Sequence, residues 1–388
     1  MNFYGYKRPD GRVGIRNHVL ILPASVCASD TARMAANQVP GATSFTNQLG
    51  CAQVPSDTQF TLDTLAGFAA NPNVYGTIVV ALGCENCQCN IVENAIKERT
   101  NKPLKSFIIR REGGTIKTIE KLVRAARDMV IEASMLRREE CSVTDLILGT
   151  ECGGSDPTSG IAANPIIGGL SDILVENGST SILCETPELM GTEHILAARA
   201  KNREVHDRIY EIVSRYEQHF INNGENIRLG NPTVGNKAGG ITTLEEKSLG
   251  CIYKAGSSTI NAVYDYSKQI NPADKGLIIM DTPGNDPASI AGMIAGGMQI
   301  CVFSTGHGTP LGSPIVPVIK ITANRETFQI MEDDMDFDAS PVFFGEKTVE
   351  EQSNELLCMV LDVCNGKLTK SEILGFSETA VMRACNYV

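Results

Sequence analysis

Short, continuous apolar runs recur along the chain, and each run ends in a turn that is rich in Gly, Cys, Asp or Ser. The runs are "HVLILPASVC", "GTIVVALGCEN", "DLILGTECGGSD", "TSILCETPE", "GLIIMDTPGND" and "QICVFSTGHGTP". They lack strict alternation of apolar and polar residues, which favours strands that are buried on both faces. Longer amphipathic stretches between them predict helices at 115–140, 195–220 and 348–364. This alternation is typical of an α/β fold with a doubly wound, mainly parallel sheet.

The length of the chain predicts more than one core. Its 388 residues exceed the roughly 100–200 residues of a single domain. The long charged helix at 115–140 separates a first α/β unit from a second one that opens at "DLILGTECGGSD". We therefore predict an N-terminal α/β domain over residues 1–140 and a C-terminal domain over residues 141–388.

Composition narrows the classes of partner and compartment. A net charge of −11 argues against a general nucleic-acid binder, which needs a basic face. The apolar runs are far shorter than the ~20 residues of a membrane span, and the first residues lack the apolar core of a secretion signal. Thirteen cysteines without framework spacing argue against disulfides. We therefore expect a cytoplasmic protein that binds a small molecule and neither nucleic acid nor a membrane.

Cysteines at the ends of apolar runs are candidate metal ligands. In open parallel sheets the carboxyl ends of the strands meet at one edge, where ligands bind. Cys51, Cys84 and Cys152 each lie beside a glycine at such an end, and three thiolates with an open position would suit iron, alone or in an iron–sulfur cluster. The C-x-x-C at 84–87 has no second pair at zinc-ribbon spacing, which disfavours a structural zinc site. The alternative is that these thiols are ordinary buried side chains.

Two glycine-rich loops supply candidate polar groups. Ser155 and Asp156, in "GTECGGSDPTSG", leave a strand and can cap a helix, while the glycines let backbone amides approach a ligand. The loop matches neither nucleotide-binding glycine motif, and the G-x-G-x-x-G of a nicotinamide-dependent dehydrogenase is absent. His307 lies between two glycines directly after a strand, which makes it a candidate general acid, general base or metal ligand.

The stretch 231–258 is a candidate binding loop for an anion. It carries Lys237, Lys247 and Lys254 among glycines and other small residues. In so acidic a chain these lysines form a local supply of positive charge for a carboxylate. The alternative is a solvated loop with surface lysines.

Seven motifs run in order along nearly the whole chain: "GYKRPDGRVGIRN", "LGCEN", "ECGGSDPTSGIAANP", "ETPELMGTEH", "NPTVGNKAGGITTLEEKSLG", "MDTPGNDP" and "FSTGHGTPLGSP". Together they resemble the UxaA/GarD family of altronate and galactarate dehydratases. The resemblance implies an N-terminal domain used in dimerisation, hence a homodimer, and a C-terminal Rossmann-like variant with a mainly parallel sheet. It also implies a metal-dependent lyase, with iron as the metal.

The activity that the resemblance implies is β-elimination of water from a sugar acid or related hydroxy acid, which gives a 2-keto acid. The alternative is the large subunit of (R)-sulfolactate sulfo-lyase, which releases sulfite and pyruvate. A non-catalytic metal-storage or partner protein is a third class, and the many small polar loops at strand ends argue against it. Many members of the family begin with a small SAF domain, whereas this sequence starts at "GYKRPDGRVGIRN". We therefore expect the SAF domain on a separate small subunit.

Two positions differ from the family pattern: Asn47 stands where the family usually has His, and His307 where it usually has Arg. Arg can bind a carboxylate through two hydrogen bonds and His cannot, which bears on the identity of the substrate. We expect His307, Lys237 and Lys247 to be catalytic, with the lysines holding the substrate carboxylate. The expected ligands of the iron are Cys51, Cys84 and Cys152, and the expected substrate-binding residues are Asn47, Ser155, Asp156, Asn236, Thr243 and Thr305.

Overall fold

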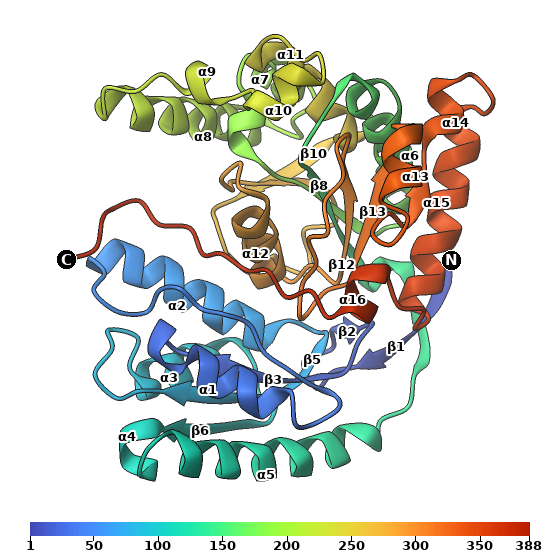
Figure 1. Ribbon diagram of the computed structural model, residues 1–388. Helices are drawn as coiled ribbons and strands as arrows, with labels where there is room; N and C mark the ends of the chain where they lie inside the picture. The colour runs from blue at the N-terminus through green and yellow to red at the C-terminus, as the bar shows by residue number, and fades with distance from the viewer.

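The computed structural model describes residues 1–388 and has a mixed α/β architecture built on two parallel sheets (Figure 1). One sheet has four strands and the other has seven. All neighbouring strands within both sheets are parallel. The predicted α/β class with a mainly parallel sheet is therefore confirmed. No helix combines the length and the apolar character that a membrane crossing needs.

The four-stranded sheet lies in the N-terminal part, in the order β4-β3-β5-β6. Its strands are β3 (His18–Pro23), β4 (Ala42–Thr43), β5 (Val74–Ala81) and β6 (Leu104–Ile108). Val19 and Ile21 of β3 pack with helices α1 (Val26–Ala36) and α5 (Thr115–Ser134). Leu20 and Leu22 share the opposite core with α2 (Pro55–Ala70) and α3 (Cys89–Arg99). The apolar run of β3 is continuous because helices cover both faces of the sheet.

The seven-stranded sheet has the order β10-β11-β9-β8-β12-β13-β14. Its strands are β8 (Ile147–Cys152), β9 (Thr180–Leu183), β10 (Ile260–Tyr264), β11 (Gly276–Met280), β12 (Ile300–Ser304), β13 (Val318–Thr322) and β14 (Phe337–Asp338). Leu148 of β8 packs with α6 (Asn164–Glu176) and α15 (Val349–Cys364). Leu183 and Leu277 pack with α8 (Arg203–Asn222), and α12 (Asp286–Gly296) shares a core with Ile182 and Ile278.

Helices α2 and α12 join the two sheets into one packed body (Figure 1). The largest core cluster, of 32 buried residues, contains side chains from both sheets, among them Leu65 of α2 and Ile290 of α12. A Cβ at Gly67 of α2 would lie 2.5 Å from the Cβ of Ala295. The two helices therefore approach so closely that a side chain at Gly67 would force them apart.

The two ends of the chain also tie the sheets together. Strand β1 (Asn2–Lys7) pairs antiparallel with β2 (Val13–Gly14) and with β7 (Glu139–Ser142), which connects the two sheets. After α16 (Lys370–Leu374), the C-terminal tail crosses to α2, where the Cys385 amide donates to Asp57 at 3.0 Å (Figure 1). The predicted boundary at residue 140 falls within β7, and the division into 1–140 and 141–388 remains a proposal.

Two predicted helices end earlier or break. The helix expected at 115–140 ends at Ser134 because Glu139–Ser142 pairs with β1. The helix expected at 195–220 is split into α7 (Glu193–Ala197) and α8, because Asn202 accepts a hydrogen bond from the Val205 amide at 2.9 Å and caps a new helix. The remaining elements are α4 (Ile109–Glu112), α9 (Ile227–Gly230), α10 (Val234–Ala238), α11 (Leu244–Cys251), α13 (Arg325–Ile330), α14 (Ser340–Phe343), the π-helix η2 (Ser159–Ala163), and the 3₁₀ helices η1 (Val143–Asp145), η3 (Thr186–Leu189) and η4 (Ile252–Ala255).

Candidate active site

The carboxyl ends of β8 and β12 form the switch point of the seven-stranded sheet. From β8 the chain continues to β9 on one side, whereas β12, which follows β11, lies on the other side of β8. Connections that leave in opposite directions open a crevice, which is where ligands bind in such sheets. The loop after β8 and the loop after β12 are joined by two hydrogen bonds. The Gly153 amide donates to the Ser304 carbonyl at 3.1 Å, and the His307 amide donates to the Gly154 carbonyl at 2.9 Å.

Glycines allow these loops to approach one another closely. A Cβ at Gly306 would lie 2.3 Å from the Asp156 carboxyl carbon, and a Cβ at Gly153 would lie 2.3 Å from an Asp286 carboxylate oxygen. Such distances exclude any side chain at either position unless the carboxylates move. The two glycines therefore set the positions of Asp156 and Asp286 beside the crevice.

A buried cluster of two thiols and two carboxylates lies at the floor of the crevice. Ligand atoms of Cys152, Glu185, Glu188 and Cys251 all lie within 4.8 Å of one another. Cys152 ends β8, Glu185 and Glu188 follow β9, and Cys251 ends α11. The cluster thus joins parts of the chain that are up to 99 residues apart (251 − 152 = 99).

Glu185, whose side chain belongs to the cluster, has a strained backbone conformation. Its φ of 68° lies in the left-handed region, which residues other than glycine seldom adopt. The Glu185 amide donates to the Thr282 hydroxyl at 2.7 Å, and the Thr186 amide donates to the Thr282 carbonyl at 3.0 Å. Thr282 therefore holds the turn in this conformation.

Two buried lysines pair with the carboxylates. The Lys254 ammonium contacts Glu185, and both side chains are completely buried. The Lys247 ammonium lies 2.5 Å from the other carboxylate, Glu188, and 3.2 Å from the side-chain oxygen of Asn231. Burial is the largest single influence on the pKa of Lys247 and lowers it, but the charge and hydrogen bond of Glu188, together with Cys152 and Glu185, outweigh burial and raise that pKa above its usual range.

Burial also raises the pKa of several acidic groups in and beside the cluster. Contact with Cys251, together with burial, raises the pKa of the Cys152 thiol well above its usual range. Burial raises the pKa of Glu185, although Lys254 opposes this effect. Burial and the charges of Glu185 and Glu188 raise the pKa of Asp286 to about 7. A metal ion that binds the thiols must therefore displace their protons.

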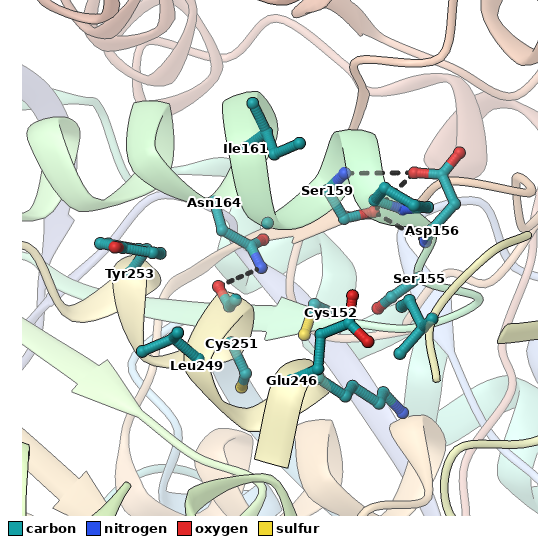
Figure 2. Close-up of a pocket in the computed structure, with 15 residues that line it drawn as sticks. Cys152, Ser155, Asp156, Ser159, Ile161, Asn164, Glu246, Leu249, Cys251 and Tyr253 are labelled. Atoms are coloured by element: carbon teal, nitrogen blue, oxygen red, sulfur yellow. Dashed lines mark hydrogen bonds between the residues drawn. The ribbon is translucent and has the colours of Figure 1, made fainter. Parts of the chain in front are cut away.

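A cavity of about 200 Å³ opens beside Cys152 and Cys251 (Figure 2). Polar groups gather at one end, and the buried Ser155 hydroxyl has no hydrogen-bond partner there. The opposite rim is apolar, and its side chains are largely exposed: Ile161 is 62% exposed and Leu249 is 45% exposed. The lining residues are Cys152, Ser155, Asp156, Pro157, Ser159, Gly160, Ile161, Asn164, Ile241, Glu246, Lys247, Leu249, Gly250, Cys251 and Tyr253.

The structure brings four of the predicted site residues together around this cavity: Cys152, Ser155, Asp156 and Lys247. Asp156 is already engaged, because its carboxylate accepts from the Ser159 amide at 3.1 Å, the Thr158 hydroxyl at 2.6 Å and the Asn324 amide group at 3.0 Å. Asp156 therefore braces the loop, whereas the Ser155 hydroxyl is free to meet a ligand.

Five further predicted residues lie on helix α10 and on loops near the cavity. The side-chain amide of Asn236 donates to the Ser155 carbonyl at 2.8 Å, and His307 Nε2 lies 3.0 Å from the Gly235 carbonyl. Lys237, one residue beyond Asn236, is exposed. The Thr243 hydroxyl accepts from the Glu246 amide and caps α11, while the Thr305 hydroxyl accepts from the Gly308 amide at 3.0 Å. Asn236, Thr243 and Thr305 therefore use these polar atoms to hold the loops.

The structure does not bring Cys51, Cys84 and Cys152 together. These three thiols do not form a group of ligand atoms within 4.8 Å of one another, because Cys51 and Cys84 follow strands of the four-stranded sheet whereas Cys152 ends a strand of the other sheet. Cys84 is exposed and Cys51 is half-buried. Asn47 precedes Cys51 in the N-terminal part of the chain. Its side chain donates to the Pro23 carbonyl at 3.1 Å and accepts from the Leu49 amide at 3.0 Å.

Sequence reasoning missed Glu185, Glu188 and Cys251 as members of the cluster. One signal was available, because "CETPE" places two carboxylates directly after a buried apolar strand. A second signal was Glu151, a charged residue within the otherwise apolar run "LILGTEC". Lys254 was expected on a loop with Lys237, and the structure instead buries it completely.

Comparison with known proteins places the chain in a family. A family model for the C-terminal region of D-galactarate/altronate dehydratases matches residues 143–386. The chain belongs to this family. A second model, for the second domain of D-galactarate dehydratase/altronate hydrolase, matches residues 5–134. The resemblance drawn from the seven motifs is therefore confirmed.

Curated members of the dehydratase family and its relatives align over almost the whole chain. The (2R)-sulfolactate sulfo-lyase subunit beta of Chromohalobacter salexigens is 38% identical over 98% of this chain and 97% of its own length. The altronate dehydratases of Bacillus subtilis and Escherichia coli are 33% and 34% identical over 98% of this chain, and the aligned part covers 78% and 77% of their lengths. These relatives are dehydratases and a sulfo-lyase, so the chain is a lyase.

Proposed function

We propose that this chain is the large subunit of a lyase that eliminates water from a sugar acid or related hydroxy acid and yields a 2-keto acid. The observation that carries the proposal is the cluster of Cys152, Glu185, Glu188 and Cys251, which borders a cavity at the switch point of the sheet. Buried charged groups next to a ligand-sized cavity are typical of a catalytic site.

The chemistry of elimination defines what the site must supply. The proton α to a carboxylate is weakly acidic and hydroxide leaves poorly, so the negative charge that develops on the substrate must be stabilised. A base must take the α-proton and an acid must protonate the departing oxygen. In our proposal the substrate carboxylate binds between the free Ser155 hydroxyl and the Lys247 ammonium, both of which line the cavity.

The donor set of the cluster fits a divalent metal ion. The buried oxygen Oε1 of Glu185 has no hydrogen-bond partner, and the thiols of Cys152 and Cys251 lie within 4.8 Å of a carboxylate oxygen of Glu185. Two thiolates with two carboxylates suit a single ferrous ion, whereas iron–sulfur clusters are mostly held by thiolates alone. We therefore propose Fe²⁺, with Glu185, Glu188 and Cys251 in place of the expected Cys51 and Cys84. A metal ion bound there would act as a Lewis acid toward the oxygens of the substrate.

We retain His307 as the proposed proton-transfer group and Lys237 as a second cation for the substrate. His307 Nε2 lies 3.0 Å from the Gly235 carbonyl, so the imidazole is held between the loop after β12 and helix α10. Lys237 lies two residues beyond Gly235 and is exposed. Both side chains are exposed to solvent, and the proposal requires them to reach the substrate from outside the cavity lining.

A second candidate function is elimination of sulfite from a sulfonated hydroxy acid. The sulfo-lyase subunit aligns with this chain over 97% of its own length, whereas the altronate dehydratases extend beyond the aligned part. Sulfite departs without a proton, so this reaction places less demand on an acid than loss of water does.

We further propose that the chain acts with a separate small subunit that carries the SAF domain, forms a homodimer through the N-terminal part and is cytoplasmic. The name of the sulfo-lyase relative, "subunit beta", supports the first of these proposals. Co-expression with a small SAF-domain protein from the same organism tests it: the two chains co-purify if the proposal holds, and the large subunit purifies alone if it does not.

A substrate panel tests the proposed reaction. The anaerobically purified protein, with its small subunit, is incubated with aldonates, galactarate and sulfolactate, and 2-keto acid and sulfite are measured separately. Release of 2-keto acid without sulfite supports the dehydratase, and release of both supports the sulfo-lyase. Absence of 2-keto acid with every hydroxy acid contradicts both proposals.

A further inference from the structure

A second group of potential ligands adjoins the first cluster. Ligand atoms of Glu151, Cys184 and Glu185 lie within 4.8 Å of one another, and all three residues are completely buried. Glu185 belongs to both groups. The second group comes from neighbouring strands, because Glu151 lies in β8 and Cys184 directly follows β9.

Among Glu151, Glu185 and Glu188, Glu151 is the carboxylate that forms no salt bridge. Glu185 pairs with Lys254 and Glu188 pairs with Lys247, whereas no lysine or arginine forms a salt bridge with Glu151. A buried carboxylate without a counter-charge is costly, so it must bind a proton or a cation.

Hydrogen bonds hold one oxygen of Glu151 and leave the other free. Oε2 accepts from the Ser289 hydroxyl at 2.8 Å and from the Cys184 thiol at 3.1 Å. Oε1 of Glu151 is buried and has no hydrogen-bond partner, and the same holds for Oε1 of Glu185. Two fully buried carboxylates, close enough for a side-chain hydrogen bond between them, therefore each present an oxygen without a donor, which a shared proton or a bound cation would complete.

We propose that Glu151, Cys184 and Glu185 bind a second divalent cation, and that Glu185 is shared between the two cation sites. One thiolate and two carboxylates suit a borderline transition metal such as Fe²⁺ or Zn²⁺ rather than Mg²⁺ or Ca²⁺. A bridging carboxylate is a common feature of sites that hold two metals. Glu151, Cys184 and Glu185 do not line the cavity, so the role of the second ion would be to fix Glu185 rather than to touch the substrate.

Metal stoichiometry tests the second site directly. The protein is purified anaerobically, saturated with Fe²⁺ or Zn²⁺, freed of loosely bound metal by gel filtration, and analysed for metal per chain by mass spectrometry. The wild type is expected to hold two ions per chain. Glu151→Gln and Cys184→Ser are each expected to retain one, because they remove a ligand of the second site alone. Cys364→Ser, the same change at a buried thiol of α15 outside both groups, is expected to retain two.

Several results would overturn the proposal. The proposal is wrong if the wild type holds no more than one ion per chain, and this result does not depend on whether the variants fold. The proposal is also wrong if the wild type holds two ions and both Glu151→Gln and Cys184→Ser still hold two. Glu151 then holds only a proton. The inference depends on the proposed function through the shared Glu185 alone, and Cys251→Ser separates the two. If the wild type holds one ion and Cys251→Ser loses it, the first site survives and the second does not.

Discussion

Removing the Lys254 ammonium is the sharpest test of the buried charge network. Lys254 and Glu185 contact each other and neither side chain is exposed, so Lys254→Met leaves a carboxylate in the interior without its partner. Breaking a buried pair in this way costs about 3–5 kcal/mol of unfolding free energy. An unfolding entropy of about 2.1 cal/mol/K per residue amounts to about 0.8 kcal/mol/K for 388 residues. The expected fall in Tm is therefore about 4–6 °C.

The assay is thermal unfolding followed by circular dichroism, after chelation so that no metal ion can replace the lost positive charge. Lys347→Met is the matched control, because Lys347 pairs with Glu355 on the surface with side chains that are 40% and 44% exposed. Exposed pairs contribute little, so this control is expected to shift Tm by no more than about 1 °C.

The double variant Lys254→Met/Glu185→Gln completes the test. Lys254→Met leaves the Glu185 carboxylate without a counter-charge, and Glu185→Gln removes that carboxylate charge. We therefore expect the double variant to be more stable than Lys254→Met alone. A Tm for Lys254→Met that matches the Lys347→Met control, or a double variant that is less stable than both single variants, would refute the reasoning.

Three further predictions concern the loops, the proton transfer and the N-terminal core. Gly306→Ala places a Cβ 2.3 Å from the Asp156 carboxyl carbon, so we expect lower turnover and a lower Tm, whereas Gly230→Ala, where a Cβ meets no atom within 4 Å, should change neither. Steady-state kinetics and thermal unfolding of both variants check this. His307→Gln can keep a hydrogen bond to the Gly235 carbonyl but cannot transfer a proton, so kcat should fall by roughly 10²-fold or more with Tm unchanged; wild-type kcat in this variant excludes His307 from proton transfer. Burial lowers the pKa of His18 to about 4. The unfolded chain therefore binds a proton near its ordinary pKa before the folded chain does, and stability should fall as pH drops from about 6.5 to 4. Urea midpoints across this range, flatter in His18→Gln than in the wild type, check the sign.

The strands and their loops could be predicted from the sequence because local pattern determines them. A continuous apolar run such as "DLILG" indicates a strand covered on both faces, and the residues that follow it must lie at the carboxyl edge of the sheet. Cys152, Ser155 and Asp156 follow from this rule, and all three line the cavity. The early end of the helix at Ser134 could not be predicted, because it depends on pairing of Glu139–Ser142 with the first strand of the chain.

The membership of the cluster could not be predicted, because it depends on which strand ends are neighbours. Cys51 and Cys152 look equivalent in the sequence, since each stands beside glycine at the end of an apolar run, but they belong to different sheets. Glu185 joins Cys152 because β9 lies beside β8, and Cys251 joins them because α11 packs against η3 and η2. Strand order and helix packing are long-range properties that no single stretch of sequence specifies.

The most direct measurement is the rate of 2-keto acid release by three proteins on whichever hydroxy acid the wild type turns over. If the Cys152 cluster is the reaction centre, Cys152→Ser releases 2-keto acid at the background rate, and Cys84→Ser matches the wild type. Wild-type turnover by Cys152→Ser, in protein whose folding is unchanged by circular dichroism, would contradict this placement of the chemistry.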